Sequence, residues 1–143
     1  MKFARWTFII AGIYGLIIIV PMFFSEYQIG IDYPPAITHP EYFYGVLSVT
    51  LAWQILFLFI AINPVKYKLL IIAAVIEKFS YGTALIILFS QNRLPMMILS
   101  GGIIDLVLGL LFVVAFFKAK ENKTVEHLEE KQINNTSNKI EEE

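Results

Sequence analysis

Four long apolar stretches, separated by short polar ones, occupy the first 117 residues of the chain. They run at about residues 3–24, 42–62, 67–90 and 95–117. Each stretch has the roughly 20 residues that an α-helix needs to cross a bilayer core of about 30 Å. The pattern therefore predicts an all-α fold, a bundle of four transmembrane helices.

Two of the three connections are short and contain proline. Asn63-Pro64 is expected to close the second helix and open the third, because proline is favoured in a first helical turn. Gln91-Asn92-Arg93 with Pro95 has the same role before the fourth helix. Both connections predict tight helical hairpins.

The remaining connection, residues 25–41, is long, aromatic and acidic, and it has no lysine or arginine. Its three prolines are Pro34, Pro35 and Pro40. Because proline lacks a backbone N–H and clashes with the preceding turn, we expect no regular helix in this connection.

Composition separates a membrane part from a tail. The whole chain is 57% hydrophobic, whereas soluble domains have about 45–50% apolar residues. Residues 118–143 are rich in lysine and glutamate and too poor in apolar residues to fold alone. We expect a transmembrane domain at 1–117 and a polar cytoplasmic tail at 118–143, partly disordered.

Lys2 and Arg5 precede an apolar run that is too long for a signal peptide, so we expect a retained first helix.

Basic residues predict how the chain lies in the membrane. In the four-helix arrangement one side collects Lys2, Arg5, Lys66, Lys68, Lys118 and Lys120, and the other has Arg93. The positive-inside rule then places both termini in the cytoplasm, for a multi-pass protein of the inner (plasma) membrane. The glycosylation sequons at Asn122, Asn134 and Asn135 would be cytoplasmic and unused.

Several function classes lose support. The chain has no cysteine, which excludes disulfides, thiol redox chemistry and cysteine-bound metals. A net charge of -1 without a basic patch indicates no nucleic-acid partner. One histidine and one glutamate, His39 and Glu41, are too few to predict a metal site, and no cofactor is predicted. We expect His127 to be a solvated residue of the tail.

Three charged residues fall inside the predicted helices. Glu77 is about eight residues, or about 12 Å, inside one end of the third helix, and Asp105 is about as far inside the opposite end of the fourth. These depths differ by only a few ångströms in a core of about 30 Å, so Glu77, Lys78 and Asp105 can meet in the bundle interior. Since each charge costs roughly 2.5–3.5 kcal/mol at a helix centre, we expect Lys78 to pair with Asp105, and Glu77 to be paired or protonated.

Other polar and small residues are expected around these charges. Helical spacing places Ser80, Tyr81 and Ala84 on the face of Glu77. The second helix contributes Thr50, Trp53 and Gln54, and the first contributes Tyr14. Small residues that permit close approach surround Asp105, namely Gly101, Gly102 and Gly109.

His39 and Glu41 lie before the second helix, beside Tyr42, Phe43 and Tyr44. One interpretation is an aromatic belt at the membrane interface, with Pro40 opening the helix. The other is that His39 and Glu41 line the entrance to the interior site.

Three interpretations of the interior residues stay open. They can hold helices together, form a pocket for a small lipophilic ligand or a partner helix, or carry protons or ions. The pocket is our leading prediction. The runner-up is an isomerase-like membrane enzyme that uses Glu77 or Asp105 as general acid or base. A structural subunit of a membrane complex is the third. The predicted partners are thus the lipid bilayer, a small lipophilic ligand, and a membrane-protein partner or second copy.

The layout of ARWTFIIAGIYGLIIIVPMFF and GGIIDLVLGLLFVVAFF as first and fourth helices resembles small DoxX-like bacterial membrane proteins. The resemblance covers the arrangement of residues 1–117. Some proteins of that kind are described as accessory to respiratory or redox complexes, which implies a protein partner.

The stretch HPEYFYGVLSVTLAWQILFLFIA is similar to EXPERA-domain proteins, the sterol isomerase and sigma-2 receptor group, in Pro40, Phe43 and Gln54. That family also has four helices and a polar intramembrane pocket. Its acidic residue about one turn before the glutamine is Thr50 here, and the acidic groups are Glu77 and Asp105 instead.

Overall fold

The computed structural model of the chain describes residues 2–120, which are all-helical apart from turns and short connections. The helices are α1 (Lys2–Met22), α2 (Glu26–Asp32), α3 (Pro40–Ile62), α4 (Lys68–Ser90) and α5 (Met96–Lys118). All except α2 are long and apolar enough to cross a membrane. The chain is therefore a multi-pass membrane protein, and the predicted all-α bundle of four transmembrane helices is confirmed. Of the predicted tail, only residues 118–120 are described, so His127 and the three sequons lie outside the described residues.

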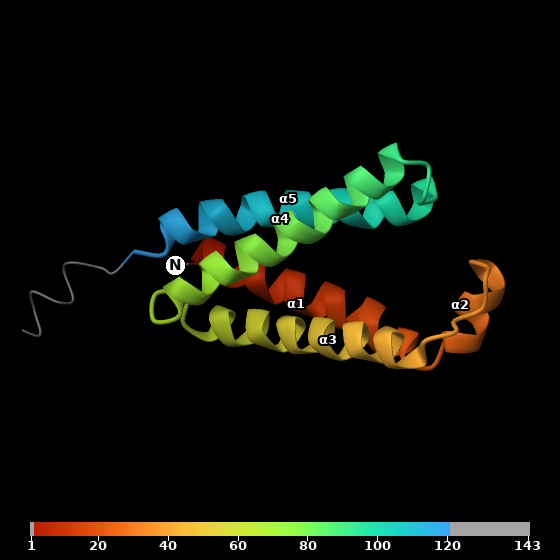
Figure 1. Ribbon diagram of the computed structural model, residues 1–143. Helices are drawn as coiled ribbons and strands as arrows, with labels where there is room; N and C mark the ends of the chain where they lie inside the picture. Colours follow the sequence, from red (N-terminus) through yellow and green to blue (C-terminus); the bar gives the residue numbers. More distant parts are fainter. Residues whose placement is uncertain (1, 121–143) are drawn as a thin grey trace, which may run out of the picture.

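The four long helices form two antiparallel pairs, α1 with α3 and α4 with α5 (Figure 1). One end of the bundle carries the start of α1, the α3–α4 turn and the last turn of α5; we call it the basic end. The opposite end carries α2 and the α4–α5 turn, and we call it the loop end. Figure 1 shows that the two pairs meet at the basic end and diverge toward the loop end.

Three phenylalanines hold the pairs together in the basic half. Phe8, Phe57 and Phe112 are completely buried. The ring centroids of Phe8 and Phe112 are 4.3 Å apart, and those of Phe57 and Phe112 are 5.1 Å apart. Small side chains surround this cluster and let the helix backbones approach one another, as is typical inside membranes; they are Ala4, Ala11, Ala61, Ala74, Ala115 and Ala119.

Glycines bring α4 and α5 together. A Cβ atom on Gly82 would lie 2.6 Å from Leu106 Cγ and 3.1 Å from the carbonyl oxygen of Gly102. A Cβ atom on Gly109 would lie 3.3 Å from Lys78 Cβ. The close fit keeps these two helices in contact along their length and holds the stem of Lys78 against α5.

The expectation that residues 25–41 contain no regular helix is wrong. Helix α2 occupies the proline-free start of this connection, and Gln28 Nε2 donates a hydrogen bond of 2.8 Å to Asp32 Oδ1 across one turn. The prolines at 34 and 35 follow the helix, so they limit only its end.

The other helix boundaries differ from the predicted ones by a few residues. Pro40 stands at the first position of α3, as expected. Pro64, however, lies in a turn that ends before α4 begins at Lys68, so it does not open that helix. Helix α1 ends at Met22 rather than near residue 24, one residue after Pro21.

Candidate functional site

A cavity of about 540 Å³ lies between the two helix pairs, on the loop-end side of the phenylalanine cluster. All four membrane-spanning helices line it, and most of its wall is apolar. The divergence of the pairs explains its position, because side chains that fill the narrow half of the bundle cannot fill the wide half. Its lining residues are Ala11, Tyr14, Gly15, Ile18, Ile19, Met22, Val46, Leu47, Val49, Thr50, Trp53, Gln54, Glu77, Lys78, Ser80, Tyr81, Gly101, Asp105 and Leu108.

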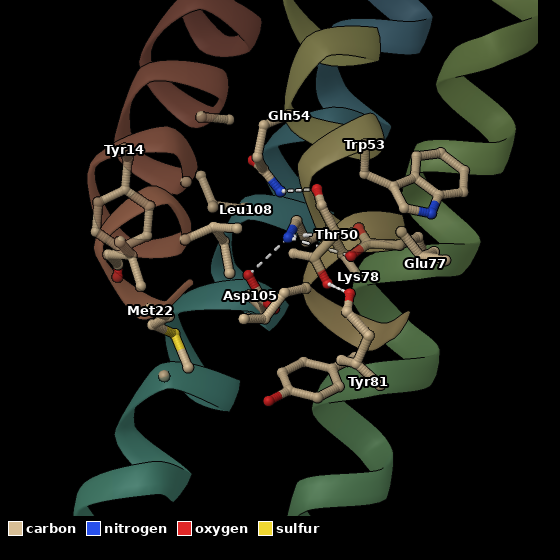
Figure 2. A pocket seen from close by; sticks show the side chains of 18 of the residues that line it. Tyr14, Met22, Thr50, Trp53, Gln54, Glu77, Lys78, Tyr81, Asp105 and Leu108 are labelled. Carbon is tan, nitrogen blue, oxygen red and sulfur yellow. Dashed lines mark hydrogen bonds and ion pairs between the residues drawn. The ribbon is translucent and has the colours of Figure 1, made fainter. Parts of the chain in front are cut away.

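Lys78 bridges two carboxylates in the wall of this cavity (Figure 2). Its Nζ atom lies 2.9 Å from Asp105 Oδ1 on α5. The same nitrogen lies 3.5 Å from Glu77 Oε1 and 3.4 Å from Glu77 Oε2 on its own helix. The prediction that Glu77, Lys78 and Asp105 meet in the bundle interior is confirmed, and we call these three residues the charged cluster.

The ammonium group of Lys78 is almost completely enclosed. The side chain is only 6% exposed, and Nζ lies 5.4 Å from the centre of the Phe57 ring, within range of a cation–π contact. The carboxylates are less enclosed, with side-chain exposures of 17% for Glu77 and 15% for Asp105. Glu77 Oε2 is buried and receives no hydrogen bond from the described residues. The cluster therefore presents carboxylate oxygen, rather than ammonium, to the cavity.

Gln54 of α3 forms a second polar feature of the cavity. Its side chain is buried, and its Nε2 atom donates a hydrogen bond of 3.1 Å to the carbonyl oxygen of Thr50 (Figure 2). The amide group rests against Gly15 of α1, where a Cβ atom would overlap it. The glycine thus leaves the space that the polar side chain occupies between α1 and α3.

The predicted polar neighbours mostly gather as expected. Thr50, Trp53, Gln54, Ser80, Tyr81 and Tyr14 line the cavity, whereas Ala84 does not. Of the glycines near Asp105, Gly101 lines the cavity, and Gly102 and Gly109 pack against α4 instead.

His39 and Glu41 do not line the cavity. They lie at the exposed start of α3, where His39 Nδ1 is 3.2 Å from Glu41 Oε1. Neighbouring aromatic residues are also exposed there, as a belt of interfacial side chains would be. Within residues 2–120, no group of three or more histidine, aspartate or glutamate side chains gathers in the way a metal ion requires.

Of the cavity-lining residues in α1, the sequence predicted only Tyr14. Beside Tyr14, this helix lines the cavity with Gly15, Ile18 and Met22. Gly12 and Gly15 were the available signal, because residues three apart lie on one helix face, and glycines there allow another helix to approach closely. A Cβ atom on Gly12 would indeed lie 2.8 Å from Leu58 Cδ2 of α3.

Comparisons with models of protein families, with curated proteins and with solved structures give no match. The resemblances to DoxX-like and EXPERA-domain proteins thus stay predictions.

Proposed function

We propose that this protein binds a small lipophilic ligand inside the membrane, in the cavity between the two helix pairs. The cavity itself carries the proposal. Its volume of about 540 Å³ falls within the roughly 300–1,000 Å³ typical of small-molecule sites. Such sites combine apolar walls with a few polar groups, and this one has the charged cluster and Gln54.

The exposed edges of the cavity support a ligand that arrives from the lipid. Val46 and Val49 of α3 are more than 60% exposed, and Tyr81 of α4 is 49% exposed, although all three line the cavity. In a membrane these surfaces face acyl chains. A molecule dissolved in the bilayer can therefore reach the charged cluster without crossing water. On this proposal the protein resides in the inner (plasma) membrane, with the basic end in the cytoplasm.

Two glycines provide a matched test. A Cβ atom added to Gly101 or to Gly45 meets nothing within 4 Å, but only Gly101 lines the cavity. We expect Gly101→Leu to fill the cavity and Gly45→Leu to leave it open, while both variants fold. Native mass spectrometry of protein extracted from membranes should show a retained small molecule on the wild type and Gly45→Leu, and none on Gly101→Leu. Equal retention by all three proteins, or none by the wild type, would contradict the proposal.

One observation favours a structural role as the second candidate. The 2.9 Å contact between Lys78 and Asp105 joins α4 to α5 and would stabilise that pair whether or not a ligand binds. In that case the cavity would be incidental, and Gly101→Leu would change neither the bound mass nor any other property that depends on a ligand.

A further inference from the structure

The hydrogen-bonding groups around the cavity are unequally available. Thr50 Oγ1 donates to the carbonyl oxygen of Val46 at 2.8 Å, and Ser80 Oγ donates to the carbonyl oxygen of Glu77 at 3.0 Å. Both hydroxyl protons are therefore used within their own helices. One amide proton of Gln54 is used in the same way.

Lys78 is also unavailable as a donor to a ligand. Asp105 and Glu77 lie on two sides of its ammonium group, and the ring of Phe57 faces it as well. An anionic ligand would have to displace a carboxylate from Lys78 to reach it. Because a buried carboxylate without its partner is strongly unfavourable, an anionic head group is disfavoured.

The accessible charged groups, by contrast, are acceptors. Glu77 Oε2 is itself buried 3.4 Å from Lys78 Nζ, but as whole side chains the carboxylates of Glu77 and Asp105 are the more exposed members of the cluster. The donors left without a partner among the described lining residues, the hydroxyl groups of Tyr14 and Tyr81 and the indole N–H of Trp53, are neutral. The lining holds one more carboxylate than ammonium group, so in its ionised form it has a net negative charge. Among residues 2–120, no other lysine or arginine lines the wall to balance that charge.

We infer that the ligand is a lipophilic molecule whose polar end donates hydrogen bonds and bears a positive charge, bound with that end against Glu77. A hydrogen bond to a carboxylate is stronger when the donor is charged, and the cavity walls shield it from water. A neutral hydroxyl group would form a weaker hydrogen bond to this carboxylate. This inference rests on the proposed function and specifies the chemical class of the ligand.

Three probes that share a ten-carbon alkyl chain and differ in head group test this inference: decylamine, 1-decanol and decanoate. The protein contains two tryptophans, so Trp6→Phe leaves Trp53, in the cavity wall, as the sole tryptophan, and excitation at its long-wavelength absorption edge selects it over the tyrosines. Trp6 itself does not line the cavity. Titration of this variant in lipid nanodiscs, followed by Trp53 emission, should show saturable binding in the order decylamine, then decanol, with decanoate weakest. We expect the amine to bind at least about tenfold more tightly than decanoate.

Substitutions of two glutamates add a matched comparison. Glu77→Gln should weaken decylamine about tenfold and change decanol little, because it removes the charge but keeps the shape. Glu41→Gln, the same change at the exposed start of α3, should leave both affinities unchanged. The comparison of head groups uses the Trp6→Phe protein without a further substitution, so it remains valid even if Glu77→Gln fails to fold.

The possible failures are distinguishable. If decanoate binds as tightly as decylamine, or if Glu77→Gln leaves decylamine unaffected, this inference is wrong and the proposed function stands. If none of the three probes changes Trp53 emission saturably, both the inference and the proposed function are wrong. The same holds if Gly101→Leu, introduced into the Trp6→Phe protein, binds the probes as tightly as the Trp6→Phe protein does.

Discussion

Lys78 of α4 and Asp105 of α5, 2.9 Å apart, form the one ion pair that joins two membrane-spanning helices within residues 2–120. Glu77 makes a longer contact with the same ammonium group. Lys78 thus contacts two carboxylates at once. Loss of Lys78 would leave both carboxylates without a cation, whereas loss of one carboxylate would leave Lys78 with the other.

Removal of Lys78 should cost the most stability. Lys78→Met leaves two neighbouring buried carboxylates without a cation, and we expect the free energy of unfolding to fall by about 3–5 kcal/mol. Asp105→Asn should cost less, because Glu77 remains to pair with Lys78. The double variant should be more stable than Lys78→Met alone, since one carboxylate has gone. Reversible unfolding in detergent and SDS mixtures measures all three, with Lys66→Met at the exposed α3–α4 turn as control. A Lys78→Met protein as stable as the wild type would contradict this account.

The phenylalanine cluster should dominate the packing of the basic half. Phe57 is completely buried and touches both other rings, so Phe57→Ala is expected to lower the free energy of unfolding by about 3 kcal/mol or more. Phe59, two residues along α3, is 52% exposed and faces lipid. Phe59→Ala should change stability by less than about 1 kcal/mol, because acyl chains solvate either side chain. Similar losses from both substitutions would show that the cluster has no special role.

Glycine substitutions should have opposite effects at crowded and open positions. Gly82→Ala places a methyl group against Leu106 and a backbone carbonyl, and overpacking of this kind typically costs about 1–3 kcal/mol. Gly45→Ala meets no atom within 4 Å and should stabilise α3 by up to about 1 kcal/mol, as alanine does in helices. Thermal midpoints in detergent provide the comparison. A Gly82→Ala protein more stable than Gly45→Ala would mean that α4 and α5 are packed less closely than the structure indicates.

The orientation predicted from basic residues can be measured directly, because the chain has no cysteine of its own. Tyr27→Cys places a thiol in exposed α2, and Lys66→Cys places one in the exposed α3–α4 turn. A membrane-impermeant maleimide added to intact cells should label Tyr27→Cys and spare Lys66→Cys until the cells are lysed. The reverse pattern would place the basic end outside.

Length and hydropathy were enough to predict the four spanning helices, because the thickness of the bilayer sets how many apolar residues each one needs. The rise of 1.5 Å per residue was also enough to place Glu77 and Asp105 at one depth. Helix α2 could not be predicted from the prolines, because they lie after it and do not affect residues 26–32. Its own seven residues, with Glu26 in the first turn, are compatible with a short helix.

The sequence by itself therefore determined the number of membrane-spanning helices, their antiparallel order and the level at which the charges meet. Only the tertiary structure decided that Lys78 is nearly enclosed while the carboxylates of Glu77 and Asp105 are more exposed. It also decided that Gly15 makes room for Gln54 and that the helix pairs diverge toward the loop end. These features depend on which side chains from distant segments fill the same space, and spacing along one helix contains no information about the helix that packs against it.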